Sequence, residues 1–151
     1  MNKPIYFSSY KELSSQENLN AFISLCKYKL TVFGENLLFD SNVWDITNYI
    51  EVKKTTKTII HFINLEEARI HNKKKKKSSV KYLEEPFLSF AKAYIRYRQG
   101  MQPIKNIGII ITSLRLIEHT LLELKGHADS TDVSADILTR AAQIALEYYS
   151  D

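Results

Sequence analysis

The fold is decided by residues 84–126, which read EEPFLSFAKAYIRYRQGMQPIKNIGIIITSLRLIEHTLLELKG. Apolar side chains recur in the first part of this stretch at helical spacing, as at Phe87 and Phe90. Pro86 suits the first turn of a helix, and the two acidic residues before it complement the helix dipole. We therefore predict a helix that opens at Pro86 and ends at Gly100.

The second part of the stretch predicts another helix, from Pro103 to Lys125, with Gly126 in the left-handed cap. Apolar residues occupy most sides of this helix, and such a helix is normally central in its fold. Its inner face is expected to hold Ile104, Ile107, Ile111, Leu114, Leu121 and Leu122. After a turn at residues 129–132, a last helix is predicted, with Ser134 as its N-cap.

Residues 1–72 predict a smaller segment of mixed type. Ser14 and Glu17 have the spacing of a capping box, so we expect a helix to start there and to stop at Gly34. Residues 55–64 are rich in β-branched side chains and predict a strand. Its partner is expected within residues 43–52 or 5–10, because a single strand needs one.

The predicted fold is therefore mainly α. A helical bundle over residues 80–151 follows an α+β N-terminal segment, and a Lys-rich linker at 73–79 joins the two. With 151 residues and 44% hydrophobic composition, the chain has enough material for one core. The single cysteine, Cys26, excludes an internal disulfide and a Cys-rich zinc site. No long apolar stretch or leader is evident, so we expect a cytoplasmic protein without a membrane partner.

Positive charge is concentrated in the middle of the chain. Residues 69–105 contain eleven Lys and Arg against two Asp and Glu, whereas residues 106–151 contain three against seven. The run at residues 73–77 is expected to be extended and solvated, because adjacent ammonium groups repel. Such a run can follow a phosphate backbone with salt-sensitive affinity. A plain flexible linker and a nuclear localisation signal are alternative interpretations.

Further basic residues alternate with aromatic ones after the run, an arrangement suited to phosphate and sugar contacts. We therefore expect duplex DNA as the partner. The candidate phosphate contacts are Lys73, Lys74, Lys75, Lys76, Lys77, Lys81, Lys92, Arg96, Arg98 and Lys105.

The sequence holds no complete catalytic or metal motif, and we expect no cofactor and no small-molecule substrate. Arg115 and His119 stand four residues apart on one helical face. Such a pair could polarise a phosphate and move a proton, as in HEPN-type ribonucleases, but an ordinary surface pair explains the same spacing. A helical protein–protein interaction module, in which the Lys run is only a linker, is a further alternative.

The chain resembles the core-binding domain of tyrosine-type site-specific recombinases, the phage-integrase family. The resemblance is carried by three stretches, residues 85–98, 111–118 and 138–143. The resemblance covers roughly residues 80–151. It implies a SAM-like helical bundle that forms one half of a clamp around DNA, with other recombinase protomers as possible partners there.

In that family a separate C-terminal domain supplies the Arg, the Lys, the His-x-x-Arg box and the Tyr nucleophile. No His in this chain is followed by Arg three residues later, so no tyrosine is assigned as a nucleophile. The resemblance therefore implies the non-catalytic, DNA-binding part of a recombinase that lacks its catalytic domain.

Overall fold

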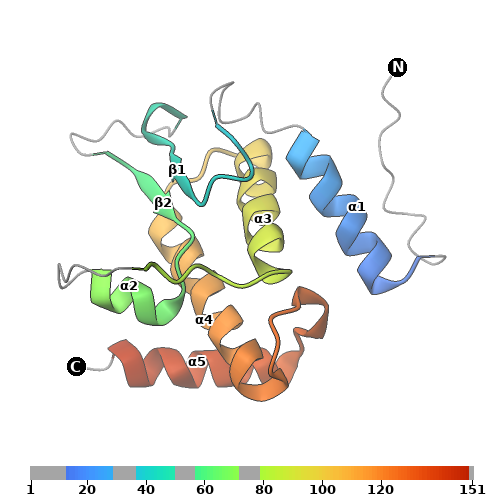
Figure 1. Ribbon diagram of the computed structural model, residues 1–151, viewed down its shortest axis with the longest axis vertical. Coiled ribbons are helices and arrows are strands. Elements are labelled where there is room, and N and C mark those ends of the chain that lie inside the picture. The colour runs from blue at the N-terminus through green and yellow to red at the C-terminus, as the bar shows by residue number, and fades with distance from the viewer. Residues whose placement is uncertain (1–12, 29–36, 50–56, 72–78, 150–151) are drawn as a thin grey trace.

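The computed structural model describes residues 13–28, 37–49, 57–71 and 79–149, and this part of the chain is mainly helical with a small sheet (Figure 1). The elements are α1 (Ser15–Tyr28), β1 (Val43–Asp45), η3 (Thr47–Tyr49), β2 (Ile59–His61), α2 (Leu65–His71), α3 (Phe87–Met101), α4 (Ile107–Lys125), η4 (Ser130–Asp132) and α5 (Ala135–Tyr149). Among the described helices, none has the length and apolar character needed to cross a membrane. The prediction of a mainly α fold is confirmed, and it contains one small two-stranded antiparallel sheet among the described residues.

Helix α1 begins where the capping box predicted. The Glu17 N–H donates to Ser14 Oγ at 3.2 Å, and the Ser14 hydroxyl donates to Glu17 Oε1 at 3.1 Å. The helix lies along α3, where the Phe22 ring meets the Tyr97 ring edge-on at 5.6 Å between centroids. Its expected end at Gly34 lies outside the described residues.

The sheet consists of β1 and β2 in antiparallel register, with Trp44 opposite Ile60. The strand predicted within residues 55–64 and its partner within 43–52 are both confirmed, although each is only three residues long. The chain just after β2 also pairs with the segment that precedes α3. The Leu83 N–H donates to the Phe62 carbonyl at 2.9 Å, and the Asn64 N–H donates to the Lys81 carbonyl at 3.0 Å.

One hydrophobic core includes residues from both predicted parts of the chain. Trp44 is fully buried, its indole N–H donates to the Leu38 carbonyl at 3.0 Å, and its ring meets Phe62 edge-on at 4.9 Å. The same cluster includes residues of α1, α3 and α4, and Ile137 of α5. The segments before residue 72 and after residue 79 therefore bury their apolar faces against each other. Residues 73–78 of the predicted linker lie outside the described part.

The corner between α3 and α4 differs from the prediction. Gly100 lies inside α3, which continues to Met101, and Pro103 lies in the connecting segment rather than in a helix. Helix α4 begins only after Asn106, whose Oδ1 accepts the Ile109 N–H at 3.4 Å. The predicted start at Pro103 is wrong because Asn106 supplies the acceptor that the first turn of the helix needs.

A buried glutamine fixes this corner. Gln99 Nε2 donates to the Tyr49 carbonyl at 2.9 Å, and Gln99 Oε1 accepts the Ile104 N–H at 2.8 Å. The amide group therefore connects α3, η3 and the segment before α4. Beyond the corner the predictions hold: Gly126 ends α4 with φ of 77°, and Ser134 Oγ accepts an N–H from the first turn of α5.

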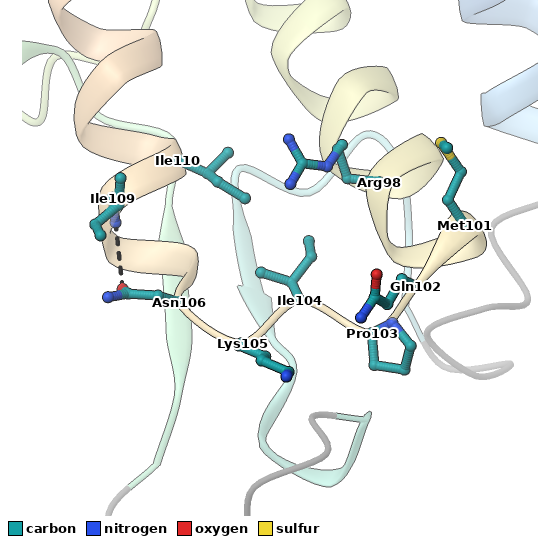
Figure 2. Close-up of a pocket in the computed structure, with 9 residues that line it drawn as sticks. All are labelled: Arg98, Met101, Gln102, Pro103, Ile104, Lys105, Asn106, Ile109 and Ile110. Carbon is teal, nitrogen blue, oxygen red and sulfur yellow. Dashed lines mark hydrogen bonds between the residues drawn. The ribbon is translucent and has the colours of Figure 1, made fainter.

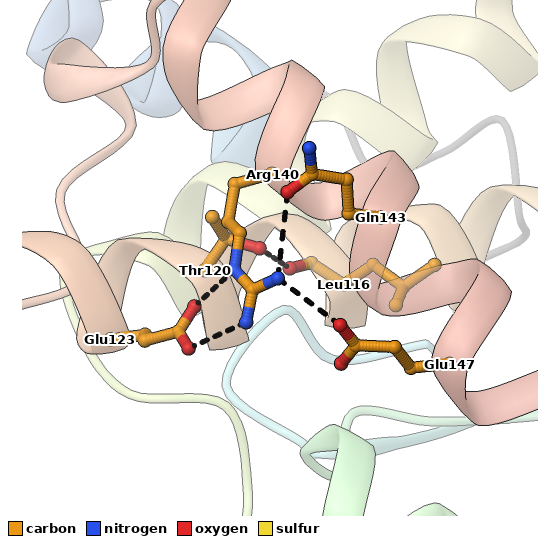
Figure 3. Close-up of polar contacts among 6 residues, drawn as sticks. All are labelled: Leu116, Thr120, Glu123, Arg140, Gln143 and Glu147. Atoms are coloured by element: carbon orange, nitrogen blue, oxygen red, sulfur yellow. Dashed lines mark hydrogen bonds and ion pairs between the residues drawn. The ribbon is translucent and has the colours of Figure 1, made fainter.

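Helix α4 is central, as its apolar sides predicted, and it packs on α2, α3 and α5. The contact with α5 includes a network around Arg140 (Figure 3). Arg140 Nε and Nη2 donate to the two carboxylate oxygens of Glu123 at 3.1 and 3.0 Å, and Nη1 donates to Glu147 at 3.3 Å. No helix was predicted at residues 65–71, where α2 lies against α4.

On its other side α4 is held to the strands by Arg115. Its Nε donates to the Ile63 carbonyl at 3.0 Å, and its Nη2 donates to the His61 carbonyl at 2.8 Å. A planar guanidinium with several fixed donors suits two neighbouring carbonyls. The side chain therefore sets the position of α4 along the β2 segment.

Replacing Arg115 by Met keeps the aliphatic stem but removes both donors to these part-buried carbonyls. The free energy of unfolding should fall by about 1–3 kcal/mol, the usual cost of leaving a buried polar group without its partner. Urea titration followed by circular dichroism measures this change. Lys125→Met, at the exposed end of the same helix, is the control and should stay within about 0.5 kcal/mol. Equal loss in the two variants would contradict the anchoring role.

Candidate nucleic-acid interface

The predicted phosphate contacts do not share one environment. Lys81, Arg98 and Lys105 are exposed and Arg96 is half-buried, whereas Lys92 is buried. The run at residues 73–77 lies outside the described residues, so its role stays a prediction.

The assignment of Lys92 as a phosphate contact is wrong. Only 4% of the residue is exposed, and its Nζ donates to Asn42 Oδ1 at 2.8 Å. The same nitrogen lies 5.6 Å from the ring centroids of Phe39 and Phe62. Burial lowers the pKa of Lys92, since removal from water disfavours the ammonium form. The amine belongs to the interior between α3 and the β1 segment and does not reach a ligand at the surface.

Arg96 lies on the side of α3 that faces α1. Burial raises the pKa of Cys26 in α1, and the positive charge of Arg96 acts in the opposite direction, which places the guanidinium near that thiol. Because Arg96 is half-buried, it is a weaker candidate for phosphate than the exposed cations.

Arg98 and Lys105 lie at the corner between α3 and α4, where they line one open depression of about 690 Å³ (Figure 2). Arg98 comes from the last turn of α3 and extends toward Ile110 of α4, while Lys105 comes from the connecting segment. Arg98 Nη1 donates to the Tyr94 hydroxyl at 2.9 Å, which uses one of its five N–H donors. The corner therefore presents two cations on one surface.

Several other cations have protein partners. The carboxylates of Glu123 and Glu147 bind Arg140, and the guanidinium of Arg69 lies 4.4 Å from the centroid of the Tyr148 ring. Among the described residues, no group of His, Cys, Asp and Glu is arranged to hold a metal ion. The corner of Arg98 and Lys105 thus places two exposed cations on one depression.

The proposed ribonuclease pair has a different geometry from the one its spacing suggested. Arg115 directs Nε and Nη2 to the carbonyls of Ile63 and His61. His119 meets the Tyr148 ring edge-on at 6.0 Å between centroids. Both side chains have structural neighbours, so the ribonuclease hypothesis gains no support from this geometry.

Glu118, next to His119 in α4, is almost completely buried. Its Oε2 accepts the Glu84 N–H at 2.9 Å, which holds the start of the α3 segment against α4. Burial raises the pKa of Glu118 to about 7; the hydrogen bond from Glu84 lowers it and the Glu84 charge raises it further. A heptad-like apolar face on α4 could have shown that position 118 points inward.

The depression at the α3–α4 corner is also lined by exposed apolar residues that the sequence analysis did not assign to a site, namely Met101, Pro103 and Ile109. The signal for Ile109 was present, because apolar residues lie on nearly every side of α4.

Comparison with protein-family models, with curated proteins and with solved structures gives no match to this chain.

Glu118 should make stability depend on pH. Its pKa is about 7 in the folded chain against an ordinary 4.5, so the folded state binds the proton more tightly than the unfolded state. Stability contributed by this proton is present below about pH 4.5 and is lost as pH rises to about 7. The loss should amount to about 3 kcal/mol, at 1.36 kcal/mol for each unit of pKa.

Glu118→Gln remains neutral and keeps an oxygen to accept the Glu84 N–H. The parent chain should lose stability as pH rises from 5 to 8, whereas this variant should not. The difference in free energy of unfolding between them, measured by urea titration, should therefore shift in favour of the variant over this range. Glu123→Gln is the matched control, because the Arg140 hydrogen bond lowers the pKa of Glu123 and its substitution should cost stability at both pH values. A constant difference between Glu118→Gln and the parent across this range would contradict the assignment.

Proposed function

We propose that this chain binds duplex DNA by contacting its phosphates and carries out no catalysis itself. The observation that carries the proposal is the pairing of Arg98 and Lys105 on one open depression, within the stretch that holds eleven basic and two acidic residues. Lys81 and the run at residues 73–77 would add contacts to the same backbone. Phosphate contacts of this kind fix position on DNA and do not read its sequence.

A narrower form of the proposal is the SAM-like core-binding part of a tyrosine-type recombinase. Its support is the resemblance of residues 85–98, 111–118 and 138–143, which lie in or next to α3, α4 and α5. The catalytic residues would then lie in another domain of the same protein. In this form the chain would be one half of a clamp around DNA.

A second candidate, a protein–protein interaction module, is favoured by the outer face of α5. Leu138, Ala142 and Leu146 are exposed at successive spacings of four residues, while Ile137 and Ile144 of the same helix are buried. An apolar stripe at this spacing suits a helical or grooved partner. Binding through it would persist as salt rises, whereas phosphate binding would not.

A titration against labelled duplex DNA at about 50 and 200 mM salt tests the DNA proposal. Affinity should fall by orders of magnitude between the two concentrations if several phosphates are neutralised. Arg98→Gln and Lys105→Gln should each weaken binding and should each make the slope of log affinity against log salt shallower by about 0.9.

Two control variants separate a local contact from a loss of net charge. Lys125→Gln removes one positive charge at the far end of α4, and Lys92→Met removes the buried one. Both should bind DNA like the parent chain. No binding at the lower salt concentration would overturn the DNA proposal. Equal losses in all four variants would overturn the assignment of the phosphate contacts to Arg98 and Lys105. Binding to a protein partner that survives the higher salt would favour the interaction module.

A further inference from the structure

The corner of Arg98 and Lys105 is as apolar as it is basic. Met101 is 68% exposed and Ile109 is 65% exposed, and Pro103 is exposed between them in sequence. All three side chains line the same depression as the two cations (Figure 2). A surface meant only for phosphates would gain nothing from large apolar side chains in contact with water.

The backbone that carries these side chains is fixed from inside. Gln99 accepts the N–H of Ile104 in the middle of the corner and donates to the Tyr49 carbonyl, and Asn106 caps the first turn of α4. The backbone positions that carry the cations and the apolar side chains are therefore held in place by these hydrogen bonds. A preformed surface loses less entropy when it binds.

The combination of positive charge and apolar surface at this corner indicates which form of DNA would fit it. A fully paired duplex presents charged phosphates and sugars along its backbone, while the apolar faces of its bases are stacked inside. An unpaired nucleotide presents a base face beside its own phosphates. Arg98 and Lys105 match the phosphates, and Met101 and Ile109 match the base face, since apolar side chains are known to contact unstacked base steps and aromatic ones to stack on single-stranded bases. The depression of about 690 Å³ is within the roughly 300–1,000 Å³ of small-molecule sites, which leaves space for one base.

We propose that the corner between α3 and α4 receives an unpaired nucleobase, and that the chain consequently prefers DNA with locally open base pairs to fully paired DNA. The inference rests on the proposed DNA binding and deepens it. It assigns the two cations to the phosphates that flank the open base, and it assigns Met101 and Ile109 to the base itself.

The test compares two labelled DNAs of equal length and equal phosphate number, one fully paired and one with two central mismatched pairs. Fluorescence anisotropy at the lower salt concentration should give about tenfold tighter binding to the mismatched DNA, which the burial of one apolar side chain against a base would supply. The double variant Met101→Ser, Ile109→Ser retains all charges. It should bind paired DNA within about twofold of the parent and lose the preference.

Leu146→Ser is the matched control, because Leu146 is 70% exposed and apolar but lies on α5. It should keep the preference. Circular dichroism checks that all variants fold. If the parent binds both DNAs equally, or if the double serine variant keeps the preference, the base assignment is overturned while DNA binding stands. If the parent binds neither DNA, both proposals fail.

Discussion

The two hydrogen bonds from the Arg115 guanidinium to the carbonyls of His61 and Ile63 hold the central helix in position, and the rest of the fold is arranged around that helix. Apolar contact alone is non-directional and would allow α4 to shift along its neighbours. Directional bonds remove that freedom. Glu118 adds another, because its carboxylate accepts the N–H of Glu84 in the segment before α3. With α4 fixed to segments from both halves of the chain, the position of the α3–α4 corner follows.

Sequence alone predicted the features of the fold that depend on neighbouring residues. The box at Ser14 and Glu17, the left-handed Gly126 and the cap at Ser134 all act within one helical turn, and all were located correctly. The start of α4 was not, because the local signal of Pro103 competed with that of Asn106. Distant contacts decided between them: Gln99 ties the intervening segment to η3, which no pattern in the sequence reveals.

The candidate site was predicted in composition but not in geometry. Counting charges identified the basic stretch, and Lys81, Arg98 and Lys105 are exposed within it. Counting charges could not show that Lys92 points into the interior. Helix α3 is covered both by α1 and by the strand segment, so it has two inner faces. For the same reason counting charges could not show which apolar residues of α4 stay uncovered. Helical periodicity places Ile109 on a face, and only the neighbours determine whether that face meets water.

The burial of Lys92 between Phe39 and Phe62 also separates its amine chemically from the exposed lysine amines of the described residues. An acylating reagent can reach the exposed amines of Lys81 and Lys105 in the folded chain. The amine of Lys92 becomes reactive only when α3 separates from the β1 segment. Its rate of modification, read by mass spectrometry, therefore reports how often this core opens, and the protein carries that reporter without any introduced label.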